Sequence, residues 1–442
     1  MKSLKTLAFL LLILWANSCT EEFVPGQDSP ENGELKYAKP HMKIAFIGGL
    51  SYMDPSLMIN CLNKGSDFMN FVSQENVCEE LCVPVINQAL SQILAEKPDL
   101  LLIAGELSYM GEKISHETVA GILKNISKQG IKVFVVPGNN DISNPSSRAY
   151  NGNGSSPVPT VTAEEFENIY KDFGFKDAIS RDPNSLSYVT QAFNNVWILG
   201  IDARIYPIVN YGLIKPETLE WIKTWLSRAK EKNITVLGLC HHNVTEPWAE
   251  TAKYGPAYVI KNHEIVENVL TEAGLRVIFT AYANDITLNA KENNVLYDIC
   301  AAYLPSFPHA WRMINMDPNY MEIETRYITS IDATIPGGAD FPEYTPACYL
   351  ERIGKKLTLL FSKPPYNSSR GDVSTFGTAD YYGFHIAKTL LAFYVGNEQF
   401  SPELQTMSQN WSLPYKQILK NVYTDLPPED LQFTVDMRKK HR

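Results

Sequence analysis

Short apolar runs alternate with longer amphipathic stretches between Met42 and Trp311. The short runs end in small or polar residues, which predicts buried strands, and the longer stretches repeat apolar residues at helical spacing. The predicted strands are Lys43–Ile47, Leu100–Ala104, Lys132–Val136, Leu186–Tyr188, Val196–Ile201, Ile234–Leu239 and Leu275–Phe279. Strands that alternate with helices indicate a layered α/β domain.

Three helices are predicted between these strands from signals at their ends. Proline is favoured in the first turn of a helix, which predicts helices at about Pro84–Glu96 and Pro216–Lys232. A third is expected to begin after an N-cap at Ser115 and to end at Gly130, because serine caps helix starts and glycine favours helix ends.

Beyond Trp311 the pattern changes to two strands followed by helices. The strands are expected at Arg312–Met316 and Tyr320–Ile328, and the helices at Thr378–Val395 and near Leu413–Tyr423. The chain of 442 residues exceeds the roughly 150 residues of an ordinary domain. We therefore expect one large domain over residues 42–311 and a hairpin with a helical extension over residues 312–442.

The N-terminus has the pattern of an export signal. Lys2 and Lys5 precede the apolar run Leu7–Trp15, which is much shorter than the ~20 residues that cross a bilayer. Small residues then lead directly to Cys19, which resembles a bacterial lipobox. An ordinary cleaved signal with an incidental cysteine is the alternative.

The lipobox reading divides the N-terminal region into two parts. Residues 1–18 would be a lipoprotein signal peptide, and residues 19–41 would be a flexible tether, since they are rich in Glu, Pro, Gly and Asn. We expect an exported protein that is held by lipid on Cys19 at a membrane of the cell envelope of a Gram-negative-type bacterium. The net charge of −10 gives no electrostatic support for a nucleic-acid partner.

Six further cysteines lie within the predicted domains. They are Cys61, Cys78, Cys82, Cys240, Cys300 and Cys348. Export permits disulfides, but a chain of this length does not need them to fold, and the sequence leaves their pairing open. Cys240 and Cys300 lie in apolar runs and are predicted to be buried. Cys78 and Cys82 are four residues apart, but the sequence has no Cys/His pair at a comparable spacing to complete a zinc site with them. We therefore predict no structural zinc.

Loops after successive strands carry the candidate chemistry, because ligands of α/β sheets bind at the carboxyl ends of strands. These loops are Gly48-Gly49-Leu50-Ser51, Gly105-Glu106, Gly138-Asn139-Asn140-Asp141, His241-His242 and Ala281-Tyr282-Ala283-Asn284. Taken singly, each also fits a structural role, such as a buried histidine pair at His241 and His242 or a helix cap at Glu106.

The order of the five loops resembles the calcineurin-like metallophosphoesterases. That family carries Asp-x-His, Gly-Asp, Gly-Asn-His-Asp, a lone His and Gly-His-x-His at the ends of consecutive strands, and the resemblance covers residues 42–311. It implies a layered αββα sandwich and a centre of two divalent ions that bind phosphate and activate water.

Most of the metal-binding positions that the resemblance implies have changed. The family's first motif is Gly49 and Ser51 in this chain, the histidine beside Asn139 is Asn140, and the last two histidines are Tyr282 and Asn284. Glu106, Asn139 and His241 remain as ligands for one divalent ion, Mn, Fe or Zn. Asp141 and His242 are expected to line the same cleft.

Three functions follow from these substitutions. The preferred hypothesis is a pseudoenzyme, a lipid-anchored phosphoesterase-fold protein that binds a ligand or a protein partner in the former active site. The first alternative is a phosphoric ester hydrolase with a rebuilt or single-metal site. The second is a structural outer-membrane lipoprotein that presents its helical extension to a partner.

Overall fold

The computed structural model describes residues 39–75, 77–205, 212–282, 285–363, 379–396, 400–411, 413–424 and 428–438. The predicted signal peptide, Cys19 and Asn284 lie outside the described residues. Among the described helices, none combines the length and the apolar character that crossing a bilayer requires.

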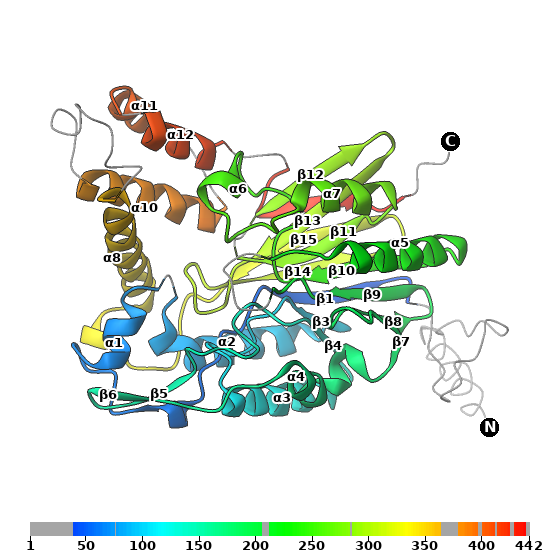
Figure 1. Ribbon diagram of the computed structural model, residues 1–442, viewed down its shortest axis with the longest axis horizontal. Coiled ribbons are helices and arrows are strands. Elements are labelled where there is room, and N and C mark those ends of the chain that lie inside the picture. Colours follow the sequence, from blue (N-terminus) through cyan, green and yellow to red (C-terminus); the bar gives the residue numbers. More distant parts are fainter. Residues whose placement is uncertain are drawn as a thin grey trace, which may run out of the picture.

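Two β-sheets stack face to face and carry helices on their outer faces (Figure 1). The first sheet has the order β16 (Gln432–Asp436), β15 (Tyr320–Tyr327), β14 (Ala310–Met316), β1 (Met42–Ile47), β3 (Leu100–Ile103) and β4 (Lys132–Val135). Strands β1, β3 and β4 run parallel, and β14 pairs antiparallel with β1. The predicted C-terminal hairpin therefore extends the same sheet as the first strand of the chain.

The second sheet is also mixed. Its order is β12 (Ile286–Lys291), β13 (Asn294–Ala301), β11 (Val277–Ala281), β10 (Thr235–Cys240), β9 (Val196–Ile201), β8 (Tyr188–Phe193) and β7 (Ala178–Arg181). Strands β9, β10, β11 and β13 run parallel. A small third sheet contains β2 (Met58–Ile59), β5 (Arg148–Asn151) and β6 (Gly154–Pro157).

The core between the sheets and the helix layers outside them confirm the predicted αββα sandwich. Phe46 of the first sheet packs on Phe279 of the second, with ring centroids 5.0 Å apart. Helices α2 (Cys82–Glu96) and α3 (Lys113–Ser127) bury apolar side chains against the first sheet, and α5 (Pro216–Glu231) and α7 (His263–Glu272) do so against the second. Cys240 and Cys300 are fully buried, as predicted.

The C-terminal helices form an arm at one side of the sandwich (Figure 1). They are α8 (Phe341–Phe361), α10 (Ala379–Val395), α11 (Pro402–Ser408) and α12 (Leu413–Val422). Aromatic rings hold the arm together, since Tyr415 stacks on Tyr382 at 4.3 Å and meets Phe361 at 4.8 Å. Three short α-helices of the described chain precede the arm and do not belong to it. They are α1 (Asp67–Val72), α4 (Ala163–Ile169) and α6 (Thr251–Tyr254).

Two local predictions were wrong. Ser115 is not an N-cap, because α3 begins at Lys113 with Glu112 in the cap position. The Ser115 hydroxyl instead accepts a hydrogen bond from the backbone N–H of Asp54 at 3.1 Å. The strand expected at Leu186–Tyr188 lies later, at β8, and pairs with β9 across the turn between them.

Candidate functional site

The loops that the sequence predicted to carry the site meet at one edge of the sandwich. The backbone N–H of Ser51 donates to the carbonyl of Glu106 at 2.6 Å, which joins the loops after β1 and β3. The second sheet reaches across, because Nδ1 of His241 lies 2.6 Å from the carbonyl oxygen of Ala104. Tyr282, after β11, donates its hydroxyl proton to Oδ1 of Asn139, after β4, at 2.9 Å.

Glu106 and His241 form a buried pair at the centre of this edge. Oε1 of Glu106 lies 3.1 Å from Nε2 of His241, and the side chains are only 3% and 1% exposed. Because the Ala104 carbonyl can only accept, Nδ1 of His241 carries a proton. The contact between Nε2 and Oε1 is attractive when one further proton lies between the imidazole and the carboxyl.

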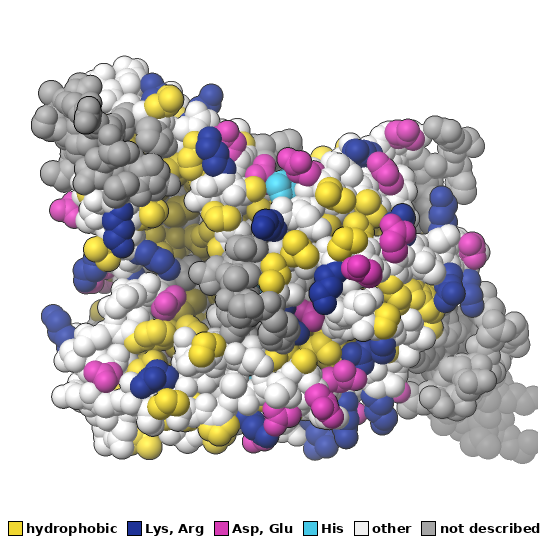
Figure 2. Space-filling view, in the orientation of Figure 1, with side chains coloured by type: hydrophobic (Ala, Val, Ile, Leu, Met, Phe, Trp, Pro, Cys, Tyr) yellow, Lys and Arg dark blue, Asp and Glu magenta, His cyan; other side chains and the backbone are white. Residues whose placement is uncertain are grey.

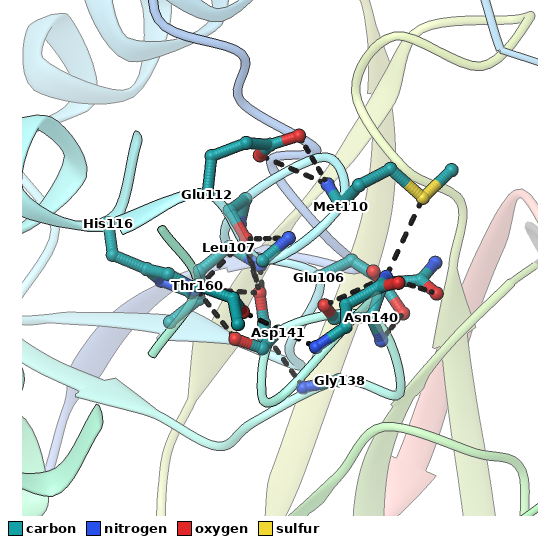
Figure 3. A network of polar contacts seen from close by, with 12 residues as sticks. Glu106, Leu107, Met110, Glu112, His116, Gly138, Asn140, Asp141 and Thr160 are labelled. Atoms are coloured by element: carbon teal, nitrogen blue, oxygen red, sulfur yellow. Dashed lines mark hydrogen bonds and ion pairs between the residues drawn. The ribbon is translucent and has the colours of Figure 1, made fainter. Parts of the chain in front are cut away.

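The environment of Glu106 favours this shared proton. Burial raises the pKa of the Glu106 carboxyl, while His241 and the backbone N–H of Asn140, at 3.2 Å, act in the opposite direction. Glu106 does not cap a helix. Its backbone has a φ of 40°, which turns the chain sharply after β3 and directs the carboxyl toward Asn140 (Figure 3).

Tyr303 fills the space beside Gly49, in the loop after β1. It follows β13, and its backbone pairs with that of Gly49 in an isolated bridge. The Tyr303 ring stacks on His241, with centroids 5.9 Å apart and planes 5° from parallel, and its hydroxyl lies 3.3 Å from Nε2. A Cβ added to Gly49 would lie 2.7 Å from Cδ1 of Tyr303, so this ring occupies the space of a side chain at position 49.

Tyr282, in the loop after β11, contacts two of the predicted site residues. Its hydroxyl lies 3.4 Å from Nε2 of His242 in addition to its bond with Asn139. Burial raises the pKa of the Tyr282 phenol well above its usual value, and the charge of Glu106 acts in the same direction. The phenol therefore stays neutral and is a poor metal ligand. Burial also holds the pKa of His242 well below its usual value.

Asp141 has a structural role in this edge. Its buried carboxylate accepts hydrogen bonds from the backbone N–H groups of Gly138 at 2.7 Å, Leu107 at 3.2 Å and Ser108 at 3.0 Å (Figure 3). The bonds join the loop after β3 to the loop after β4. The hydroxyl of Ser51, in the loop after β1, donates to Oε2 of Glu79 at 3.3 Å.

The donors that remain do not fit a pair of divalent ions. Within the described residues, no third His, Cys, Asp or Glu lies close enough to Glu106 and His241 to share an ion with them. The amide oxygen of Asn139 is already bonded to Tyr282. Two-metal catalysis needs several ligands for each ion, including a bridging carboxylate. This site offers one carboxyl, one imidazole and an engaged amide.

A cavity of about 480 Å³ opens in front of these residues. Strand-end loops form one side, and α8, α10 and α12 form the other, where Figure 2 shows a recess lined by hydrophobic side chains. Its aromatic lining includes Tyr109, Trp248, Tyr254, Tyr258, Tyr282, Tyr303, Phe361 and Tyr394. The sequence did not predict the contribution of the arm, and it missed Tyr303, which lies two residues after the end of β13.

Two polar atoms of the cavity wall are without partners in the described part of the chain. Trp248 and Tyr109 are each 3% exposed. The indole Nε1 of Trp248 and the hydroxyl of Tyr109 have no hydrogen-bond partner there. An unpaired buried donor costs about 1–3 kcal/mol, so a ligand whose acceptor reached either group would gain affinity.

The two stacked mixed sheets, with their loops meeting at one edge, define an α/β sandwich of the metallophosphoesterase type. A family model described as calcineurin-like phosphoesterase matches residues 74–281. This stretch of the chain, from just after α1 to the end of β11, is thus similar to the calcineurin-like phosphoesterases. No curated protein matches the sequence.

Several solved structures resemble the chain at low identity. A dimetal phosphatase from Danio rerio is 13% identical, with 65% of this chain and 97% of that chain covered and a TM-score of 0.46. A purple acid phosphatase from yellow lupin seeds is 11% identical, with coverage of 65% and 51% and a TM-score of 0.40. The GAP50 anchor of the Plasmodium inner membrane complex is 10% identical, with coverage of 71% and 95% and a TM-score of 0.32.

Proposed function

We propose that this protein is a phosphoesterase-fold pseudoenzyme that binds a small organic ligand in the former metal cleft. The observation that carries the proposal is that two tyrosines occupy the cleft between the strand-end loops. Tyr303 fills the space beside Gly49, and Tyr282 engages Asn139. The cleft has thereby exchanged an ionic site for an aromatic cavity.

The lining favours a neutral aromatic molecule that carries a hydrogen-bond acceptor. Aromatic faces take up flat rings by stacking or edge contacts. The basic groups His241 and Lys356 each lie near a carboxyl of the cavity, that of Glu106 and that of Glu75, so phosphate would have to compete with these carboxyls for them. The free indole N–H of Trp248 can only donate, so it would bond an acceptor on the ligand.

The proposal predicts saturable binding of 2-naphthol, a neutral fluorescent ring with one oxygen. Trp248→Phe keeps a ring but removes the donor, and it should weaken binding about tenfold, the loss that one hydrogen bond of about 1.4 kcal/mol represents. Trp221→Phe is the matched control, because Trp221 lies on α5 and its indole bonds Ser180 at 3.2 Å. Fluorescence titration measures both. Absent binding, or equal effects of the two variants, would contradict the ligand class.

A single-ion hydrolase is the second candidate function. The observation that favours it is the adjacency of Glu106 and His241, which still lie 3.1 Å apart. An ion there would have to displace the shared proton and free Asn139 from Tyr282. One equivalent of tightly bound Mn, Fe or Zn that disappears in His241→Ala would support this alternative.

The location of the protein is part of the proposal. We infer lipid attachment at Cys19 and a position in the cell envelope, with the tether placing the cavity some distance from the membrane. The lipobox pattern supports this inference. Expression in a Gram-negative host should give a membrane-bound, acylated protein, and Cys19→Ala should abolish acylation. An unmodified wild-type N-terminus would refute the anchor.

A further inference from the structure

Two cysteines that are far apart in the sequence meet where the helical arm joins the sandwich. The sulfur atoms of Cys78 and Cys348 and a carboxylate oxygen of Glu80 all lie within 4.8 Å of one another. Cys78 precedes a turn of 3-10 helix, Glu79–Leu81, whereas Cys348 lies on α8. The two thiols are hydrogen-bonded to each other.

A buried ion pair holds these two segments together. Nη2 of Arg352 lies 2.6 Å from Oε1 of Glu80, and Nη1 donates to the carbonyl of Val77 at 2.6 Å. The Tyr344 hydroxyl donates to the same Glu80 oxygen at 2.8 Å. Arg352 and Tyr344 both belong to α8, so three hydrogen bonds fix α8 beside the segment that carries Cys78.

The two thiols differ in reactivity. Cys348 is half-buried and within reach of solvent, whereas Cys78 is buried. The hydrogen bond from Cys78 lowers the pKa of the Cys348 thiol to about 7, and the Arg352 guanidinium contributes, against the effect of burial. The hydrogen bond and burial raise the pKa of Cys78. A thiolate is the attacking species in disulfide exchange, so Cys348 would react first.

We propose that Cys78 and Cys348 form a redox-active pair that closes into a disulfide and locks the arm onto the sandwich. The oxidant is a small-molecule disulfide. The Cys348 thiolate attacks one sulfur of the oxidant, forms a mixed disulfide and releases one thiolate. Cys78 then loses its proton and attacks the sulfur of Cys348, which forms the protein disulfide and releases the second thiolate. Two protein thiols are oxidised and one external disulfide is reduced.

The bond would fix two walls of the aromatic cavity relative to each other. Glu75 and Val77, next to Cys78, line one wall. Ile353 and Lys356, one and two turns beyond Cys348 on α8, line the facing wall. Closing so long a loop constrains the unfolded chain strongly. The oxidised protein should therefore be more stable and its cavity more rigid.

A metal ion is the competing occupant of the same cluster. The carboxylate and two thiolates could bind zinc, and Oε2 of Glu80 has no hydrogen-bond partner in the described residues. However, the guanidinium of Arg352 already neutralises Glu80 and would repel a second cation at this short range. The positive charge of Arg352 stabilises a thiolate at Cys348 but repels a divalent cation. The cluster is therefore better suited to disulfide formation than to metal binding.

The test treats the folded, full mature protein with oxidised glutathione, followed by alkylation and peptide mapping by mass spectrometry. The expected product has lost two hydrogen atoms, joins the Cys78 and Cys348 peptides, and shows a raised Tm that returns to its initial value on reduction. Cys82→Ser is the matched control and should form the same bond, whereas Cys348→Ser should not.

Three outcomes would overturn the proposal. They are a lasting glutathione adduct on Cys348, a bond between Cys78 and Cys82, and one equivalent of bound zinc that blocks both thiols. Each is read from the wild-type protein by intact mass, peptide mapping and elemental analysis, so the result does not depend on whether a variant folds.

Discussion

Gly49→Asp is expected to destabilise the protein by about 3 kcal/mol, although aspartate is the residue type that the family resemblance implies at this position. A Cβ at position 49 would lie 2.7 Å from Cδ1 of Tyr303 and 3.1 Å from the carbonyl oxygen of Gly105. The new carboxylate would also be buried beside Glu106, without a metal ion to neutralise it. Chemical denaturation measures the change in the free energy of unfolding.

The clash between a side chain at position 49 and Tyr303 leads to a second prediction, for the double variant. Tyr303→Ala removes the ring, so the double variant should be more stable than the sum of the two single changes implies, by about 1–3 kcal/mol. Gly121→Asp is the control, because Gly121 lies on α3 and a Cβ there meets no atom within 4 Å. Strict additivity of Gly49→Asp and Tyr303→Ala would show that the ring does not fill the former ligand position.

Asp141→Ala is expected to destabilise the protein by about 3–5 kcal/mol. The carboxylate is fully buried, and its loss leaves the N–H groups of Gly138, Leu107 and Ser108 without their acceptor. Since these bonds join two of the strand-end loops, the cavity should lose ligand affinity as well as stability.

The control for this change is Asp332→Ala, at an exposed position. Surface substitutions of this kind usually change stability by less than about 0.5 kcal/mol. Thermal and chemical denaturation of both variants would separate the roles. A loss below about 1 kcal/mol in Asp141→Ala would contradict the view that this carboxylate organises the site.

Apolar periodicity predicted the layered α/β domain well because the central strands are buried on both faces, whereas the αββα sandwich was implied by the family resemblance. Helix Pro216–Glu231 begins at the predicted residue, and β14 ends and β15 begins at the predicted residues, Met316 and Tyr320. Helix starts without a proline were harder to place. Glu112 holds the cap position of α3, and the sequence favoured Ser115 because serine is the commoner cap.

The sequence could predict only those residues of the candidate site that lie in loops directly after strands. The meeting of Glu106 with His241 follows from the order of the sheets, which the resemblance supplied. To predict the position of Tyr303, one would need to know how β13 pairs with β11. To predict the cavity wall formed by α8, one would need to know how distant segments pack together. Local patterns along the chain do not encode either of these long-range contacts.

The most direct test of the pseudoenzyme proposal is a hydrolysis assay of the mature protein on bis(4-nitrophenyl) phosphate with added Mn²⁺, Fe²⁺ or Zn²⁺. Because the donors at Glu106, Asn139 and His241 do not fit two ions, we predict a rate no higher than that of the free ion, and no change in Glu106→Ala or His241→Ala. Robust turnover that both variants abolish would contradict the proposal.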